Sequence, residues 1–434
     1  MDTETTATVS RIELFRQLKS TIKGSKDILI VGIDVSKQYS VACIIDASGE
    51  IHLKKFRFDN TIAGATEITN KAHMLKQTLP KKEIVWALEP TGNYHKPLAD
   101  FLLRQGAMLV GVSTVAAKEN RKSLDGRWKK NDPKDAHNVA DLVSQGKMFF
   151  YNQSPQVKTI KHLLKLRQRI AAELSAIKAR LRNNHFALFF PELDSLYADI
   201  THPEVLLLLE YFPTAEDIRT LSFDQFQNVF AAKTRSPQGR QRLAEIWRRA
   251  QNSIACAKIP SVDIEIPQTL ESISLFKKQL AAIEKHITHL CAQDDAYRAL
   301  QQIPGFGPII SATVLATIGS IQNFTKASQL TKLVGLDLEY IQSGKFHSAA
   351  KVSKKGDSLL RYKICSAAIY ALKNKRIRSL ADQYFLRKDP TPQNKAKFRI
   401  KLADKLLRTA FTLLKYNRSF DMDTFLNPVK IACV

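Results

Sequence analysis

Four carboxylates in the first third of the chain have a spacing that indicates chemistry. Asp34 follows an apolar run that predicts a strand, and Glu89 follows another. Asp132 and Asp135 lie three residues apart at the start of a predicted helix, so both can point from one helix face. Strand ends in an α/β domain can converge on one edge of the sheet. The four side chains could therefore meet at one site.

Such a set of carboxylates predicts a divalent metal site. Acidic side chains held close repel one another unless a cation lies among them, and hard oxygen ligands suit Mg²⁺ or Mn²⁺. Two such ions about 4 Å apart can stabilise the attacking and the leaving oxygen at a phosphate. We expect all four residues to be catalytic and to bind the metal: Asp34, Glu89, Asp132 and Asp135. Each signal alone is weak: a strand-end Asp such as Asp34 is commonly a turn or cap residue, and Asp132 before Pro133 also suits a helix N-cap, whereas Glu89 before Pro-Thr-Gly is harder to explain structurally.

The charge of the chain indicates a polyanionic partner. Lys and Arg number 66 against 41 Asp and Glu, which gives a net charge of +25. A basic run just before the helix predicts a track for a phosphate backbone, with a solvated loop as the alternative: Arg121, Lys122, Arg127, Lys129 and Lys130. A basic protein without a nucleic-acid partner is the other explanation of the composition. We expect nucleic acid to be the partner.

The second half contains a serine and two glycines that could act on a phosphate. A serine hydroxyl such as that of Ser343 becomes a good nucleophile only when a base takes its proton; the alternative is a turn serine before Gly344. Gly305 and Gly307 in IPGFGP either present N–H groups to a phosphate or form a simple turn. Basic residues near the serine indicate backbone contacts or a solvated patch: Lys345, Lys351, Lys354, Lys355 and Arg361.

The elements around the carboxylates predict an α/β domain over 27–150. Strands are expected at 27–36, 39–47, 51–59, 83–90 and 107–113. Helices are expected at 62–79, at about 94–105 and from Asp132 onward. Three consecutive strands that lead into helix–strand units favour a mixed sheet, at whose edge the carboxylates would lie.

Helices are expected in the rest of the chain. Residues 155–190 predict one long helix, and apolar residues at 270–290 repeat at nearly heptad spacing. We expect an antiparallel coiled-coil pair within 151–295, with a helical insertion at about 195–260; plain core helices are the alternative. A small, mainly helical domain at 296–372 and a basic helical tail at 373–434 would follow.

Two further features limit the class of protein. The five cysteines form no CxxC pair, so neither a zinc site nor a disulfide framework is indicated. The first residues do not resemble a signal peptide, and no apolar run reaches the roughly 20 residues that a membrane helix needs. We expect a cytoplasmic protein with no membrane partner.

The motifs around the carboxylates resemble a known family. VGIDVSK, WALEPTGNY and KKNDPKDAHNVADL together are similar to the DEDD domain of the bacterial insertion-sequence 110/1111 group of transposases, which includes the Piv-type DNA invertases. The resemblance implies a ribonuclease H-like domain similar to the RuvC Holliday-junction resolvase. It also implies that the four carboxylates form a metal-binding tetrad.

The second half resembles the C-terminal transposase domain of the same family, so that the resemblance covers about 27–190 and 300–372. It runs from the IPGFGP turn through YIQSGKFHSAAKVSKKGDSLLRYKICSAA. It implies that Ser343 is a nucleophile that forms a phosphoserine link to DNA, although a register slip toward Ser348 or Ser353 stays open. It further implies donor and target DNA, a structured bridge RNA, a dimer or tetramer, and a bacterial, nucleoid-associated location.

The sequence thus predicts a DNA transposase or site-specific recombinase with a Mg²⁺-bound tetrad and a serine nucleophile. Three alternatives stay open. A RuvC-like hydrolytic nuclease would remain active as Ser343→Ala, and a non-catalytic nucleic-acid-binding protein would lose nothing as Asp34→Ala. A site-specific invertase would use the same chemistry at inverted sites in place of element ends.

Overall fold

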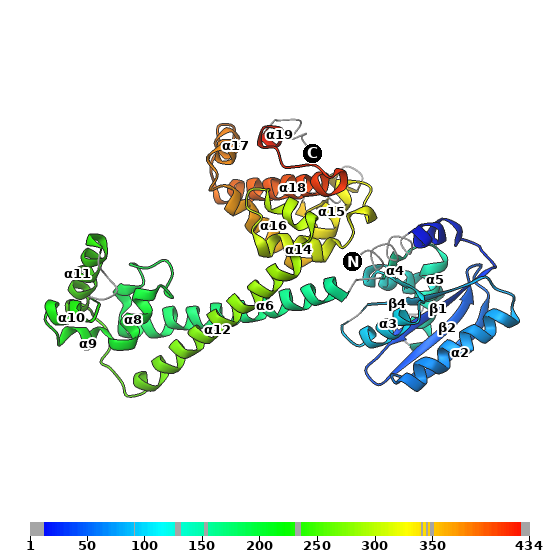
Figure 1. Ribbon diagram of the computed structural model, residues 1–434, viewed down its shortest axis with the longest axis horizontal. Helices are drawn as coiled ribbons and strands as arrows, with labels where there is room; N and C mark the ends of the chain where they lie inside the picture. Colours follow the sequence, from blue (N-terminus) through cyan, green and yellow to red (C-terminus); the bar gives the residue numbers. More distant parts are fainter. Residues whose placement is uncertain are drawn as a thin grey trace. The chain divides into compact units, whose positions relative to one another are not determined.

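The structure is a computed structural model, and it forms two compact units, 1–154 and 155–434 (Figure 1). The residues that it describes are 13–90, 92–125, 132–151, 155–230, 236–339, 342–343, 346–347 and 351–426. Each unit has hydrophobic cores of its own, and each is described separately below.

A six-stranded sheet forms the centre of the first unit. Its order is β3-β2-β1-β4-β5-β6. The strands are β1 (Ile28–Val35), β2 (Tyr39–Asp46), β3 (Ile51–Asp59), β4 (Glu83–Leu88), β5 (Met108–Gly111) and β6 (Phe149–Phe150). β2 is antiparallel to β1 and β3, β4 is parallel to β1 and β5, and β6 is an antiparallel edge. The expected mixed α/β fold, with three consecutive strands first, is confirmed.

Helices cover both faces of this sheet. On one face, α2 (Ile62–Thr78) and α3 (His95–Arg104) pack against Leu29, Val31 and Ile33 of β1. On the other face, α4 (Thr114–Asp125) and α5 (Asp132–Ser144) pack against Ile28 and Ile30. Because β1 is buried on both sides, its sequence is a nearly continuous apolar run. That run ends at Asp34, where the chain meets the edge of the sheet.

Two long helices lead into and out of the helical insertion. α6 (Pro155–Arg180) continues through a π-helical turn, η1 (Leu181–Phe186), into α7 (Ala187–Phe189), so the expected single helix contains a local change of winding. α12 (Val262–Cys291) runs antiparallel to α6 (Figure 1). The Gln156 side chain donates to the Leu290 carbonyl at 2.6 Å, and Arg167 pairs with Glu284 farther along.

The insertion between these helices is a helical module with an aromatic core. It contains η2 (Pro191–Leu193), α8 (Pro203–Tyr211), α9 (Ala215–Arg219), α10 (Phe223–Phe230) and α11 (Pro237–Gln251). Its largest buried side chains are Phe186, Phe190, Phe226 and Phe230. The core also takes in Ile177 of α6 and Ile273 of α12. The far ends of the long helices are therefore fixed by globular packing.

The C-terminal part of the second unit shares one core. Its elements are α13 (Asp295–Gln301), α14 (Pro308–Ile318), η3 (Ile321–Asn323), α15 (Ala327–Val334), β7 (Leu338–Glu339), β8 (Gln342–Ser343), β9 (Phe346–His347), β10 (Lys351–Val352), α16 (Ser358–Ala371), α17 (Lys375–Phe385), α18 (Pro392–Tyr416) and α19 (Met422–Leu426). Leu402, Leu406 and Leu407 of α18 are buried in the same core as α14 and α16. The basic segment beyond 372 thus packs with the residues before it. No helix among the described residues is long and apolar enough to cross a membrane.

Candidate active site

Asp34 and Glu89 lie at the same edge of the sheet. Ile33 of β1 is the register partner of Leu88 in the parallel strand β4. Asp34 and Glu89 are each one residue further along, and neighbouring strands are about 4.8 Å apart. Both residues are half-buried. The pairing of β1 with β4 therefore brings together two carboxylates that are 55 positions apart in the sequence.

The alternation of side chains gives both carboxylates the same face of the sheet. Side chains alternate along a strand, so Asp34 points to the same face of the sheet as Ile28 and Ile30. By the same alternation, Glu89 points to the face of Val85 and Ala87. These four apolar residues all belong to the core beneath α4 and α5. Asp34 and Glu89 therefore lie on the side of the sheet that α5 covers.

Gly32 lets α5 lie directly against β1. A Cβ at Gly32 would collide with the carbonyl oxygen of Ala136 and with the backbone nitrogen of Ala140. Gly32 is two residues before Asp34, on the same face of β1, and Ala136 directly follows Asp135. The close packing of helix on strand therefore brings the Asp135 end of α5 near the carboxylates of the sheet.

Asp135 is buried and is ion-paired to α4. It is 4% exposed, and its Oδ1 lies 2.6 Å from the Nε of Arg121. Arg121 was expected to contact a phosphate; in this structure its guanidinium group faces the predicted metal ligand. Asp132 begins α5, and its side chain lies outside the described residues. Three of the four predicted carboxylates are thus placed, on β1, after β4 and on α5.

A buried polar network that sequence reasoning missed fixes α4 to α5. The Asn120 amide donates to Asn138 at 2.9 Å and to Asp141 at 2.6 Å. Asn138 in turn donates to the Ala117 carbonyl at 2.8 Å, and Gln145 donates to Asp141 at 2.8 Å. The network holds the turn of α4 that carries Arg121. Its signal was present in the AHNVADL motif, where Asn138 and Asp141 are polar residues on the buried side of a helix.

The structure places some of the predicted nucleic-acid contacts and not others. The side chains of Lys122, Arg127, Lys129, Lys130 and Lys345 lie outside the described residues. Lys355 pairs with Glu339 at 2.8 Å, while Lys351 and Lys354 are exposed. Arg361 donates to the carbonyl oxygens of Val334 and Lys354, at 2.9 and 3.2 Å. Arg361 therefore connects the end of α15, which precedes β7, to the turn that follows β10.

The two glycines of IPGFGP have different surroundings. Gly305 has φ +88°, and a Cβ there would collide with the Ala367 carbonyl of α16. Gly307 is the N-cap residue of α14, and a Cβ there would meet nothing within 4 Å. Gly305 is thus required by helix packing, whereas the open space at Gly307 leaves room for an approaching group.

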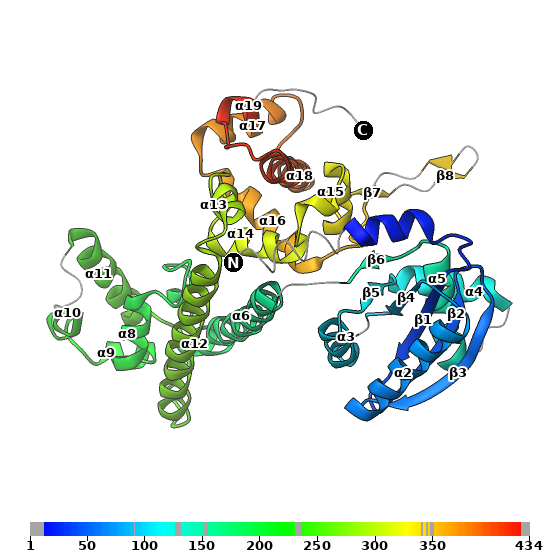
Figure 2. The ribbon, with the colours of Figure 1, turned by 45° about the vertical axis from the view of Figure 1, so that its right-hand side comes forward.

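Ser343 lies on a short hairpin of the second unit (Figure 2). In the antiparallel pair β8–β9, Ser343 is the partner of Phe346, and Gln342 is the partner of His347. The side chains of this hairpin lie outside the described residues. The tetrad residues and Ser343 therefore belong to different compact units of the chain.

A second acidic cluster, which the sequence did not suggest, lies at the other end of the sheet. Asp46, Glu50 and His52 have ligand atoms within 4.8 Å of one another, a spacing that a metal ion could use. Asp46 is the partner of Leu29, five residues before Asp34 on β1. The cluster is therefore roughly 17 Å from the candidate active site, at about 3.4 Å per residue.

The Asp46 carboxylate already pairs with a lysine and accepts several hydrogen bonds. Its carboxylate accepts hydrogen bonds from the Ser48 hydroxyl and the Glu50 amide, and Lys81 lies 3.2 Å from it. Burial would raise the pKa of Asp46, but these hydrogen bonds and Lys81 lower it to about 2. Because Lys81 and the hydrogen-bond donors already compensate the charge of Asp46, we interpret the cluster as a cap on the turn between β2 and β3.

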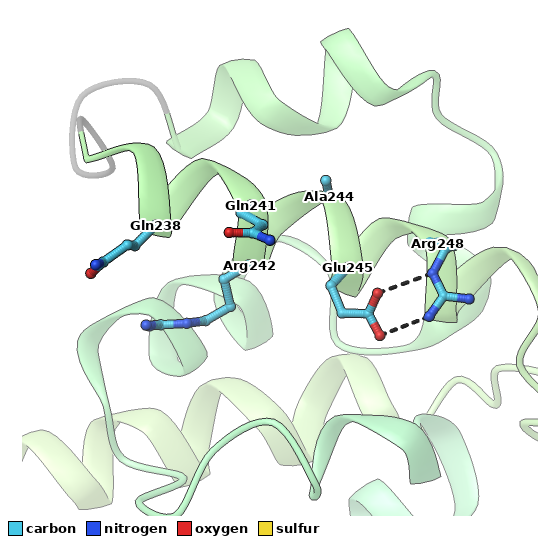
Figure 3. A pocket seen from close by; sticks show the side chains of 6 residues that line it. All are labelled: Gln238, Gln241, Arg242, Ala244, Glu245 and Arg248. Atoms are coloured by element: carbon cyan, nitrogen blue, oxygen red, sulfur yellow. Dashed lines mark hydrogen bonds and ion pairs between the residues drawn. The ribbon is translucent and has the colours of Figure 1, made fainter.

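A surface hollow on the insertion module offers no comparable chemistry (Figure 3). It is lined by side chains of α11 alone: Gln238, Gln241, Arg242, Ala244, Glu245 and Arg248. Glu245 is bound by Arg248 at 2.8 Å and by Arg249 at 2.7 Å, so its charge is neutralised within the helix. The lining presents no convergent set of carboxylates.

A mixed sheet with carboxylates at one edge, followed by helical segments, is compatible with a DEDD nuclease-like domain in a larger enzyme. Two families match the sequence: a transposase family with the DEDD domain of IS110 over residues 31–191, and the transposase IS116/IS110/IS902 family over residues 297–384. The chain belongs to the IS110 family of transposases, which are enzymes that act on DNA.

Individual relatives agree with this assignment. The transposase for insertion sequence element IS1111A of Coxiella burnetii is 22% identical over 356 residues, which are 81% of this chain and 79% of the relative. An IS116 protein of Streptomyces clavuligerus is 23% identical over 327 residues, 71% of this chain and 76% of the relative. An IS110 protein of Streptomyces coelicolor is 25% identical over 226 residues, 48% of this chain and 52% of that protein.

Proposed function

We propose that the chain cleaves and rejoins DNA strands at a site formed by Asp34, Glu89, Asp132 and Asp135, with Ser343 as the nucleophile. The observation that supports the site most directly is the register of β1 and β4. It sets Asp34 beside Glu89, on the face of the sheet that α5 covers. The strand order and the antiparallel β2 also favour the RuvC and ribonuclease H-like fold.

The tetrad fits a divalent cation. Its donors are carboxylate oxygens, which suit Mg²⁺ or Mn²⁺, and Asp135 is buried with the Arg121 guanidinium group against it. A positive charge is therefore already accommodated at this carboxylate. When bound, such ions stabilise the charge on the attacking and leaving oxygens of a phosphodiester. Asp34, Glu89, Asp132 and Asp135 would hold them.

Ser343 would make and break the covalent link. Its Oγ attacks the phosphorus, the bond from phosphorus to the leaving sugar oxygen breaks, and a phosphoserine forms. A tetrad carboxylate accepts the hydroxyl proton, and the leaving oxygen is protonated. In the second half, the sugar hydroxyl of the new partner strand attacks the phosphoserine and releases Ser343. No external oxidant or energy source is needed, because each phosphodiester bond broken is replaced.

The proposal also includes the domain organisation of the chain and its partners. Residues 27–150 form the catalytic domain, 151–295 the helical region with a coiled-coil pair, 296–372 the serine domain and 373–434 a basic extension. Because the tetrad and Ser343 lie in different units, the proposed mechanism requires that Ser343 reach a tetrad, either that of its own chain or that of another protomer in a dimer or tetramer. A structured bridge RNA would pair with donor and target DNA, and the net charge of +25 supports binding of both polyanions near the nucleoid.

A covalent adduct is the decisive measurement. The full chain is incubated with Mg²⁺, co-purified RNA and DNA that carries element ends, and the products are separated under denaturing conditions. We expect a protein–DNA adduct that is absent in Ser343→Ala and in Asp34→Ala. Asp27→Asn is the matched carboxylate control, because Asp27 pairs with Lys82 on an exposed surface and should leave the adduct intact.

The register of the serine is tested in the same assay. Ser353 donates to Asp337 at 2.5 Å and so has a structural partner, and Ser353→Ala should still form the adduct. Loss of the adduct in Ser348→Ala but not in Ser343→Ala would transfer the role to that serine. DNA cleaved without an adduct by Ser343→Ala would show a hydrolytic nuclease and overturn the serine mechanism.

A further inference from the structure

The solvent-facing side of α16 carries large side chains that the core does not need. Tyr362 is 64% exposed, Ile369 49% and Tyr370 54%. The opposite side of the helix is fully packed by Leu360, Ile364, Ala367, Ala368 and Ala371. The two tyrosines are eight residues apart, which corresponds to about 12 Å along a helix. Both rings therefore lie outside the hydrophobic core that the other side of α16 helps to form.

Each of these tyrosines has a lysine beside its ring. The Lys363 Nζ lies 5.6 Å from the centroid of the Tyr362 ring, and the Lys373 Nζ lies 5.3 Å from that of Tyr370. We call the five residues the α16 platform: Tyr362, Lys363, Ile369, Tyr370 and Lys373. Proteins that bind single-stranded nucleic acids combine aromatic rings with nearby cations, since bases stack on the rings and phosphates meet the cations.

The surroundings of the platform are strongly basic. Residues 351–401 contain 15 Lys and Arg against 3 Asp, a net charge of +12 within a chain of +25. The pKa of Lys363 is lowered by burial and by the nearby Arg167, while Glu284 acts in the opposite direction. Charge complementarity therefore favours a polyanion over a protein partner on this surface.

We propose that the α16 platform binds an unpaired segment of RNA, with bases stacked on Tyr362 and Tyr370 and phosphates at Lys363 and Lys373. Stacking on a protein ring needs a free base face, which a duplex conceals and the loops of a structured RNA present. This inference rests on the guide RNA of the proposed function. It adds which part of the chain holds the unpaired bases.

Binding of a labelled, unstructured oligouridine to the full chain tests the platform. Tyr362→Ala and Tyr370→Ala should each weaken binding about 5- to 100-fold, the range for loss of one stacked base. Tyr362→Phe and Tyr370→Phe should bind nearly as the parent chain does, because the ring is kept. Lys363→Gln should reduce the dependence of log Kd on log salt by about 0.7, whereas the tyrosine variants should leave that slope unchanged.

Tyr211→Ala is the matched control, because Tyr211 is 55% exposed on α8 and lies in the nearly neutral insertion. It should not change RNA affinity. Equal losses in Tyr211→Ala and the platform variants, or no loss in the platform variants, would overturn the inference. So would equal losses with duplex DNA, whose bases offer no free face on which the two tyrosines could stack.

The platform and the cleavage mechanism fail separately. The oligouridine assay does not depend on cleavage. If the parent chain forms no DNA adduct but Tyr362→Ala loses RNA affinity, the platform is supported and the cleavage proposal is not. If the adduct forms with the parent chain but oligouridine binding is unaffected in both tyrosine variants, the cleavage proposal stands and the platform is wrong. Thermal melting of each variant should match the parent, because both rings are exposed.

Discussion

Asp135 is a carboxylate that the fold buries almost completely, with Arg121 of α4 as its cationic partner. An unpaired buried carboxylate is costly, so the ion pair with Arg121 offsets part of the cost of burying Asp135. A divalent ion would offer Asp135 a second, stronger partner. Arg121 would then be released toward the phosphate that it was expected to contact. Metal binding and DNA binding would thereby depend on one residue.

Arg121→Gln should therefore destabilise the metal-free chain and be rescued by magnesium. We expect a loss of about 1–3 kcal/mol in the free energy of unfolding, less than for a fully buried pair because Arg121 is 30% exposed. Urea denaturation with and without Mg²⁺ measures the effect. Mg²⁺ should stabilise Arg121→Gln more than the parent chain; an equal response would show that the ion does not reach Asp135.

Arg104→Gln is the control for the charge change. Arg104 pairs with Asp100 one helical turn away on an exposed surface of α3. Exposed pairs of this kind contribute about 0.3–0.5 kcal/mol, so its unfolding should hardly change with or without Mg²⁺.

Single residues differ in how far the sequence predicts them. Asp34 and Glu89 were identifiable because each ends an apolar run, a signal that lies within a few neighbouring residues. The ion pair between Arg121 and Asp135 was not identifiable from the sequence, because it depends on the packing of α4 on α5. The cap at Asp46 was also missed, since Lys81 approaches it from 35 positions along the chain.

At the scale of elements, the contact of α5 with β1 determines whether the carboxylates meet. Gly32→Ala would place a methyl group against the Ala136 carbonyl and Ala140. Overpacking of this kind costs about 1–3 kcal/mol and moves the helix away from the strand. We expect lower stability in urea together with loss of the DNA adduct. Gly307→Ala, which meets nothing within 4 Å, should cost under about 1 kcal/mol.

The turn between β2 and β3 should make stability depend on pH through Asp46. Its pKa in the folded chain, about 2, is below the ordinary value of 3.8. The stabilisation is therefore complete above about pH 4 and is lost as the pH falls toward 2. Asp46→Asn should cost about 2 kcal/mol at pH 7, and urea denaturation at pH 7, 4 and 3 should show the difference shrinking. Asp27→Asn, at an exposed pair, should show no such trend.

Element boundaries show where sequence reasoning ends. The five strands and the helix at 62–79 were predicted closely, because their apolar patterns reflect burial against the sheet. The helix expected over 155–190 changes to π-helical winding at Leu181–Phe186, where the chain enters the insertion core. α12 begins at Val262 and contains Pro267, a residue that locally predicts a helix start. Tertiary packing decided both cases.

At the scale of the whole molecule, positive charge is unevenly distributed. Residues 351–401 carry a net +12, whereas the insertion at 195–260 has 8 Lys and Arg against 7 Asp and Glu, a net +1. Several insertion arginines are also paired: Arg242 with Glu204, and Arg248 and Arg249 with Glu245. Electrostatic attraction to DNA should therefore come from the C-terminal region, with the insertion outside the contact surface.

Two triple variants with the same change in net charge test this distribution. Lys395, Lys397 and Arg399 are exposed at the start of α18, and their replacement by Gln removes three positive charges. Replacing Arg242, Arg248 and Arg249 of the insertion by Gln removes the same number. Each lost phosphate contact lowers the slope of log affinity against log salt by about 0.9 for duplex DNA.

The α18 variant should therefore reduce that slope by about 2 to 3, and the insertion variant should leave it unchanged. Because both variants have the same net charge, a general weakening of the long-range field would affect them equally. A difference between them can only reflect where the phosphates lie. If the insertion variant lost as much slope as the α18 variant, its arginines would exchange their glutamate partners for phosphates, and the insertion would belong to the DNA-binding surface.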